Sequence, residues 1–182
     1  MRAILTPAAL PGAALDELKS WLAISSAADD AALSALLKTA LELCEGFTGQ
    51  MVLEAECEEL LPAAPGRWLA LSTRPVLSIS LAEGIPAESP RFALAANAYA
   101  IELDADGGAR FRLIRQGAAG RIAVRFTAGL ADEWAALPEA IRHGVIRLAA
   151  HLYRQRDEGN ASGAPPAVVA ALWRPWRRMH LL

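Results

Sequence analysis

The sequence predicts an α+β fold: a small helical bundle built from the N- and C-terminal helices, with an inserted antiparallel β-sheet. Near both ends of the chain, apolar residues recur every three or four positions, which is the spacing of one helix face. In the middle third the period changes to two, which is the spacing of a half-buried strand. The sequence assembles no set of residues suited to catalysis, and this favours an assembly component over an enzyme.

Three helices are predicted, over residues 14–22, 29–47 and 138–156. The second begins at Asp29-Asp30, where acidic side chains cap a helix and suit the positive end of its dipole. Glycines at its C-terminal end favour a stop. The third opens on Pro138, because proline is favoured in the first turn of a helix.

A β-rich insert is predicted over residues 51–128. Alternating apolar and polar residues indicate five strands, at 53–58, 77–81, 99–103, 110–113 and 121–126. Asp104–Gly108 is a strong turn signal between the third and fourth strands, and Gln116–Gly120 is predicted to join the fourth and fifth as a hairpin. Each strand, with the alternating apolar residues of 77–81 as one example, is expected to turn one apolar face inward and one polar face to water.

Length and composition fit a soluble globular chain. The 182 residues suffice for one domain, predicted over 1–163 and followed by a C-terminal helix or arm over 164–182. The N-terminus lacks a signal-peptide pattern and no run of about 18 apolar residues occurs, so no membrane partner is expected. Cys44 and Cys57 have no C-x-x-C spacing and no nearby histidine, and they are expected to be buried, reduced thiols of a cytosolic product.

The net charge of −2 hides an asymmetry between the two halves of the chain. Residues 1–91 hold six Lys and Arg against twelve Asp and Glu, a net charge of −6. Residues 92–182 hold twelve against eight, a net charge of +4. Such a molecule is expected to carry oppositely charged surfaces, which bears on how copies of it could meet.

The predicted helix over 138–156 has two distinct faces. One is a core stripe formed by Ile141, Val145, Leu148 and Leu152. The opposite face carries the residues His143, Arg147, His151 and Arg154. The two histidines are eight residues apart, whereas a helical pair of metal ligands needs a spacing of three or four, so no metal site is predicted. A solvated polar face and a basic contact surface for a partner remain the two interpretations.

The acidic pairs Glu54/Glu56 and Glu58/Glu59 are predicted to lie on a solvated strand face. They could in principle serve as acid and base, but no apolar pocket is indicated around them to raise a pKa. Motifs of nucleotide-binding loops, zinc proteases and serine hydrolases do not occur in the sequence. We therefore predict no catalytic residue, no cofactor and no metal.

The strands carry charges of both signs. The acidic set is Glu54, Glu56 and Glu58, and the basic set is Arg110, Arg112, Arg121 and Arg125. The two sets could be cross-strand neighbours within one sheet. Alternatively they could lie on opposite sides of the subunit, which would suit a head-to-tail contact that closes into a ring.

The C-terminal segment is basic and aromatic, with Trp173, Arg174, Trp176, Arg177 and Arg178. Nucleic-acid binding is disfavoured because the sequence pI is about 5.9. Because Trp and Arg dominate protein interfaces, an arm that docks onto another protein is one interpretation. A last helix folded onto the chain's own core is the other.

Taken in order, these motifs resemble the head–tail connector family of long-tailed bacteriophages, whose members also occur in gene transfer agents. The likeness spans about residues 15–175. The matching positions are Asp29, Asp30, Leu33, Glu42, Glu45 and Thr48-Gly49, then Arg74-Pro75-Val76, Asp106-Gly107 and Thr127-Ala128-Gly129, then Leu137 to Ile141 with Tyr153 and Arg156. This chain has Phe47 where a tyrosine is commoner and Gln50 where a basic residue is common.

The resemblance implies a structural adaptor in the neck of a phage-like particle, made in the bacterial cytoplasm. Its partners would be the portal protein, neighbouring copies in a ring that most often has twelve subunits, and a tail-side stopper or terminator protein. DNA would pass through the ring without sequence-specific binding. The resemblance also implies that residues 164–182 contact the portal or a neighbouring subunit, and we expect their deletion to leave the fold intact while abolishing incorporation. The alternatives are a tail-terminator or minor tail protein, and then a small DNA-binding regulator or enzyme.

Overall fold

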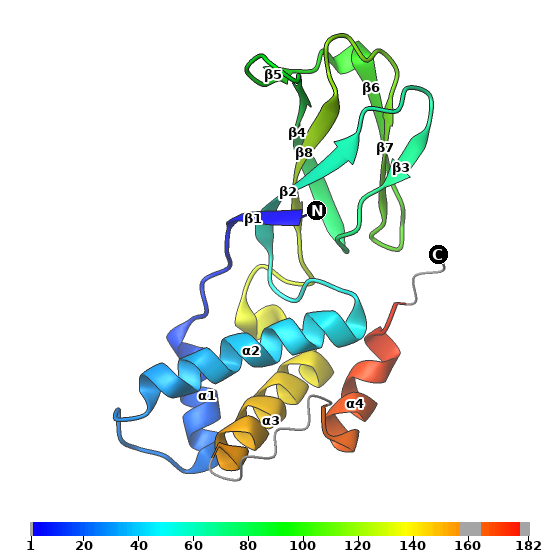
Figure 1. Ribbon diagram of the computed structural model, residues 1–182. Coiled ribbons are helices and arrows are strands. Elements are labelled where there is room, and N and C mark those ends of the chain that lie inside the picture. The colour runs from blue at the N-terminus through cyan, green and yellow to red at the C-terminus, as the bar shows by residue number, and fades with distance from the viewer. Residues whose placement is uncertain (1, 157–164, 179–182) are drawn as a thin grey trace. The chain divides into compact units, whose positions relative to one another are not determined.

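The computed structural model describes residues 2–156 and 165–178. The chain forms two compact units, each assembled from two separate stretches of sequence (Figure 1). Residues 1–8 and 54–130 form a β unit, and residues 9–53 and 131–182 form a helical unit. The predicted α+β class is therefore confirmed, with strands and helices in separate units.

The β unit contains two antiparallel sheets. The larger has the order β1-β2-β8-β4-β5, with bounds Arg2–Thr6, Ala55–Pro62, Arg121–Ala128, Val76–Ile85 and Phe92–Ala93. The smaller has the order β3-β7-β6, with bounds Trp68–Ala70, Ala109–Leu113 and Tyr99–Leu103. Phe111 from the smaller sheet and Phe126 from the larger are both fully buried, and they belong to the core of this unit.

The sequence missed three short strands and one change of sheet. β1, β3 and β5 were not predicted, and β3 and β5 are only three and two residues long. The predicted hairpin at Gln116–Gly120 is wrong, because β7 and β8 belong to different sheets and do not pair. The segment carries the chain from one sheet to the other. By contrast, β6 and β7 pair antiparallel across the turn at Asp104–Gly108, as the sequence predicted.

Strand β4 does not keep the simple alternation that its sequence suggests. Its pairing with β8 shifts register between Val76 and Ser78 and again between Ile79 and Leu81. Each shift changes which side chains point inward. As a result Leu77 is 46% exposed, and the expectation that it shares a buried face with Ile79 is wrong.

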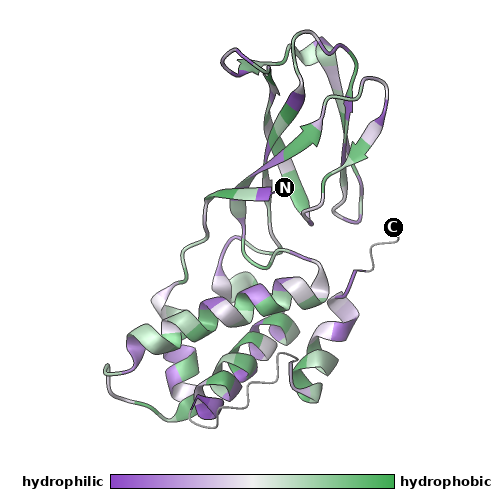
Figure 2. Ribbon diagram, viewed as in Figure 1, coloured by the Kyte–Doolittle hydropathy of each residue, from purple (hydrophilic) through white to green (hydrophobic). Residues whose placement is uncertain are grey.

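The helical unit consists of α1 (Gly12–Leu22), α2 (Asp30–Thr48), α3 (Glu139–Gln155) and α4 (Ala167–Trp173). Short 3-10 turns precede α3 at Trp134–Ala136 and follow α4 at Arg174–Trp176. The other three helices all pack against α3. Figure 2 shows hydrophobic and hydrophilic residues interleaved along these helices, as amphipathic packing requires.

The core of the helical unit follows the predicted stripe on α3 and extends beyond it. Ile141, Val145 and Leu148 are buried, whereas Leu152 is only partly so. Ile146 and Ala149 are buried as well, because α3 has neighbours on several sides. Among the described residues, no helix is long and apolar enough to cross a membrane.

Glu59 is the only acidic side chain of β2 that points into the β unit's apolar side, in line with Ala55, Cys57 and Leu61. It is 3% exposed, so the prediction of a solvated position is wrong. Its carboxylate accepts hydrogen bonds from the backbone N–H and hydroxyl groups of both Ser72 and Thr73, at 2.6–2.9 Å. These four hydrogen bonds replace those that water would make to the carboxylate. They also hold the loop after β3 against β2.

We predict that Glu59→Gln destabilises the protein by roughly 2 kcal/mol, because an amide nitrogen cannot accept the bonds that one carboxylate oxygen accepts. Urea denaturation measures the change. The matched control is Glu88→Gln on an exposed loop, which should leave stability within about 0.5 kcal/mol of the wild type. Equal stability of the two variants would contradict the role given to Glu59.

Candidate interaction surfaces

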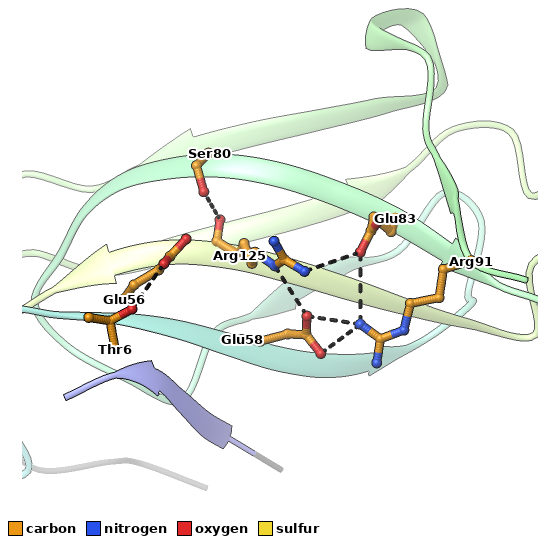
Figure 3. Close-up of polar contacts among 7 residues, drawn as sticks. All are labelled: Thr6, Glu56, Glu58, Ser80, Glu83, Arg91 and Arg125. Carbon is orange, nitrogen blue, oxygen red and sulfur yellow. Dashed lines mark hydrogen bonds and ion pairs between the residues drawn. The ribbon is translucent and has the colours of Figure 1, made fainter.

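A closed network of charges covers one face of the larger sheet (Figure 3). Both carboxylate oxygens of Glu58 lie 2.9 Å from Nη1 of Arg91, and one lies 3.5 Å from Nε of Arg125. Glu83 on β4 completes the network, 3.8 Å from Arg91 and 3.9 Å from Arg125. Glu58 and Arg125 are register partners on β2 and β8, so the sheet pairing itself creates this contact.

This network decides between the two interpretations of the strand charges for one pair. Glu58 and Arg125 are cross-strand neighbours and neutralise each other within the subunit. Glu58 is 8% exposed, so the expected solvated acidic face is wrong at this position. The arginine side chains lie over the carboxylate and exclude water from it.

The remaining predicted arginines do not form one face. Arg110 and Arg112 belong to β7 in the smaller sheet, whereas Arg121 is an exposed residue at the start of β8. Arg110 lies 3.1 Å from Asp104 and 3.3 Å from Glu102, and its hydrogen bond with Asp104 raises the pKa of the guanidinium. The guanidinium of Arg112 stacks 4.7 Å from the ring centre of Trp68.

Glu54 and Glu56 line an open groove of about 380 Å³ at the β1 side of the larger sheet. The other lining residues are Thr6, Pro7, Ala55 and Thr127. The hydroxyl of Thr6 lies 3.5 Å from the Glu56 carboxylate, at the limit of a hydrogen bond. Both glutamates are partly exposed, so this part of the predicted acidic face does reach the surface.

The C-terminal segment packs onto the helical unit as far as the structure describes it. The side chain of Trp173 is fully buried against α3, where Gly144 leaves room for its indole. The indole N–H donates to the Ile141 carbonyl at 3.4 Å, and the ring lies 5.9 Å from that of Phe47. Trp173 is therefore part of the core, whereas Arg174 and its neighbours Arg177 and Arg178 are exposed.

The end of α2 holds the residues that follow α4. The Gln50 amide donates to the carbonyl of Trp176, and the backbone N–H of Arg178 donates to the Thr48 carbonyl at 2.8 Å. The guanidinium of Arg177 lies 5.6 Å from the Phe47 ring centre. Phe47 and Gln50, the two departures from the family pattern, are thus the residues that fasten this segment.

These contacts correct the expectation for deletion of residues 164–182. Part of that range, 164 and 179–182, lies outside the described residues. Removal of the described part would take Trp173 out of the core and uncover the α3 surface around Gly144. Such a deletion would destabilise the helical unit instead of leaving the fold intact.

The predicted basic face of α3 borders a pocket of about 280 Å³. We call it the basic pocket; it is lined by Trp21, Arg147, His151 and Arg154 together with Pro166, Val168 and Val169 of the C-terminal segment. The Arg147 guanidinium lies 5.3 Å from the ring centre of Trp21, and the His143 ring meets the same indole edge to face at 5.2 Å. Trp21, which the sequence did not single out, therefore organises this face.

The two ends of the family pattern meet in one cluster. The Tyr153 hydroxyl donates to a carboxylate oxygen of Asp29 at 2.8 Å, and Nη1 of Arg156 lies 3.6 Å from the other oxygen. Asp29 occupies the N-cap position of α2, but its side chain makes no capping hydrogen bond, contrary to the expectation. Asp30 instead pairs with Lys19 of α1 at 2.7 Å. Asp29 therefore joins α2 to α3, and Asp30 joins α2 to α1.

The described residues contain no group of three His, Cys, Asp or Glu that could hold a metal ion. The two thiols are buried and form no disulfide. Burial, with a smaller contribution from Glu45, raises the pKa of the Cys44 thiol to about 12, so this sulfur is protonated at neutral pH. Three surfaces predicted from the sequence keep accessible charge in the structure: the groove at Glu54 and Glu56, the basic pocket and the exposed C-terminal arginines.

Solved structures with a similar fold come from gene transfer agent (GTA) particles. A chain of the neck of an empty GTA particle, computed with C6 symmetry, is 29% identical with a TM-score of 0.79, over 100% of this chain and 97% of that chain. A chain of the native GTA virion is 30% identical with a TM-score of 0.75, again over 100% and 97%. A chain of the native neck, computed with C12 symmetry, is 29% identical with a TM-score of 0.75, over 99% and 97%. No protein-family model and no curated protein matches the chain.

We predict that Gly144→Ala destabilises the helical unit by about 1–3 kcal/mol, the usual cost of overpacking a core. A Cβ at this position would overlap the Trp173 indole, with Cε2 at only 2.7 Å. Gly46→Ala in α2 is the matched control, because nothing lies within 4 Å of its added Cβ. Urea denaturation compares the two, and an unchanged midpoint for Gly144→Ala would contradict the close packing of α4.

We predict that the wild type has a higher free energy of unfolding than Tyr153→Phe, and that this difference becomes smaller at alkaline pH. The hydrogen bond to Asp29, followed by burial, raises the pKa of Tyr153 because it favours the neutral phenol. The stabilisation is therefore fully present below the ordinary tyrosine pKa of about 10 and is lost as the pH rises through the higher folded value. Urea denaturation of both proteins at about pH 8 and pH 11 tests this, and a pH-independent difference would contradict it.

Proposed function

Because this chain belongs to the same family as the GTA chains that it matches over its full length, we propose that it joins the portal of a phage-like head to the tail. In this role it is a structural adaptor with no catalytic step. Copies form a ring in the neck of the particle, and the ring continues the channel through which DNA passes.

The observation that carries this proposal is the end-to-end match. An alignment over 100% of this chain and 97% of the GTA neck chain includes both the β unit and the helical unit. If only one of the two units matched, the other unit could belong to a protein with a different function. The neck structures were computed with C6 and C12 symmetry, which supports a ring of copies as the working form.

The charges of this chain support protein contacts over sequence-specific DNA binding. Its net charge is −2, whereas phosphate recognition needs a strong excess of Lys and Arg on one surface. On the larger sheet, Arg91 and Arg125 are already paired with carboxylates. The exposed arginines at the C-terminal end (Arg174, Arg177 and Arg178) are proposed to contact the portal.

A tail-terminator or minor tail protein is the second candidate, because the neck also contains tail-side components in the expected assembly. The two differ in the particle fraction that carries them. A connector should be present on tailless heads, whereas a terminator should be present on tails that lack heads. Mass spectrometry of the two purified fractions separates the candidates, and absence of the chain from both would overturn a neck function.

We predict that the double substitution Arg174→Glu and Arg178→Glu lowers incorporation into heads about tenfold or more, because reversed charges oppose a contact made by arginines. Arg177 is left intact because it packs on Phe47. Lys38→Glu reverses one charge at an exposed position of α2, outside this segment, and is the control that should incorporate normally. Immunoblots of purified heads measure incorporation, and normal incorporation of the double variant would exclude a portal contact through these arginines.

A further inference from the structure

We propose that the basic pocket receives the Asp132–Glu133 loop of a neighbouring copy, and that this contact links subunits around the ring. The inference rests on the proposed function, because it needs copies to stand side by side. It concerns the contact between copies and not the contact with the portal. Both surfaces belong to the helical unit.

The basic pocket holds positive charges that have no acidic partner within the part of the chain that the structure describes. Among residues 2–156 and 165–178, Arg147 and Arg154 have no carboxylate within ion-pair distance, and Nε of Arg147 is buried without a hydrogen-bond acceptor. Arg142, on the same helix, differs because it pairs with Glu139 at 2.7 Å and Glu17 at 3.8 Å. A carboxylate brought in from outside would satisfy the two open arginines and the facing His151.

The apolar part of the basic pocket suits a protein segment better than a free ion. Trp21 is 41% exposed and Val168 is 48% exposed, although both are large apolar residues. The indole holds the Arg147 guanidinium by stacking, so little side-chain freedom remains to be lost when a partner binds. Tryptophan and arginine together at a pocket are typical of the residues that dominate binding energy at interfaces.

The Asp132–Glu133 loop has the complementary properties. Both acidic residues are exposed, and within the described part of the chain neither carboxylate has an ion-pair or hydrogen-bond partner. Both ends of the loop are anchored: Ala131 bridges to Leu53, and the buried Trp134 donates its indole N–H to Glu17 at 2.9 Å. The loop is therefore a short, exposed acidic segment whose two ends are anchored.

The acidic residues at the larger sheet fit the basic pocket less well. Glu58, Glu59 and Glu83 already have partners inside the β unit. Glu54 and Glu56 line a groove of their own, and a concave surface cannot enter a second concave surface. An exposed loop with two adjacent carboxylates has both the shape and the charge that the basic pocket requires.

The positions of the two surfaces suit a ring. The loop lies just before the N-terminus of α3, while His151 lies in its last turns, about 18 Å further along the helix axis at 1.5 Å per residue. Two different surfaces of one subunit can make a head-to-tail contact, in which every copy uses both. Such a contact closes into a ring when the rotation between copies divides a full turn.

The test is disulfide crosslinking in assembled particles that carry Glu133→Cys together with Arg154→Cys. Oxidation should join neighbouring copies into a ladder of covalent multimers on a non-reducing gel. The native Cys44 and Cys57 are fully buried and should not contribute. The matched control pairs Glu133→Cys with Thr39→Cys, an exposed position on α2, and should give no ladder.

A second measurement uses charge reversal and does not depend on oxidation. Arg147→Glu with Arg154→Glu, or Asp132→Arg with Glu133→Arg, should each lower incorporation about tenfold, and the combination of both pairs should restore it. Particles that contain the cysteine variant but give no ladder would overturn the inference, as would normal incorporation of either charge-reversed pair. Absence of the wild-type chain from particles would instead overturn the proposed function.

Discussion

The antiparallel pairing of β2 with β8 is the constraint on which much of this structure depends. The two strands stay in register over eight pairs, from Ala55 with Ala128 to Pro62 with Arg121. The helical unit is interrupted immediately before β2 and resumes just after β8, so their pairing closes the insert and brings Leu53 to Ala131. The same register sets Glu58 opposite Arg125 and turns Glu59 inward. A shift of one residue would reverse both side chains and leave a carboxylate buried without its partners.

The helices could be predicted well because their determinants are local. Helical spacing, an acidic first turn and a proline start placed α2 and α3 within one or two residues of their observed bounds. The sheets were harder, because a strand is defined by partners distant in sequence. The bulges in β4 and the change of sheet between β7 and β8 have no local signal. The alternation of apolar and polar residues therefore found strands but not their neighbours.

The candidate site shows the same division between local and distant information. The sequence identified the basic face of α3, but it could not show that Trp21 stacks on Arg147, since the two are 126 residues apart. It grouped four arginines that the fold separates into two sheets. It also left open whether Trp173 lies on a docking arm or in the chain's own core, whereas the structure shows that Gly144 provides the space that buries it. The one signal available in the sequence was Gly144, a glycine inside a predicted helix. The structure shows that this glycine faces Trp173.

The two units use charge in different ways, and this difference bears on assembly. In the β unit, Glu58, Glu83, Arg91 and Arg125 satisfy one another, which stabilises the sheet and leaves little attraction for a partner. In the helical unit, the Asp29 cluster joins α2 to α3, yet Arg147 and Arg154 on the same helix have no carboxylate partner among residues 2–156 and 165–178. Trp21, which is exposed beside them, adds an apolar surface that a partner would bury. In the proposed ring, α3 contributes to the contact between copies and also forms the centre of the subunit's core, whereas the arginines after α4 are proposed to serve the portal.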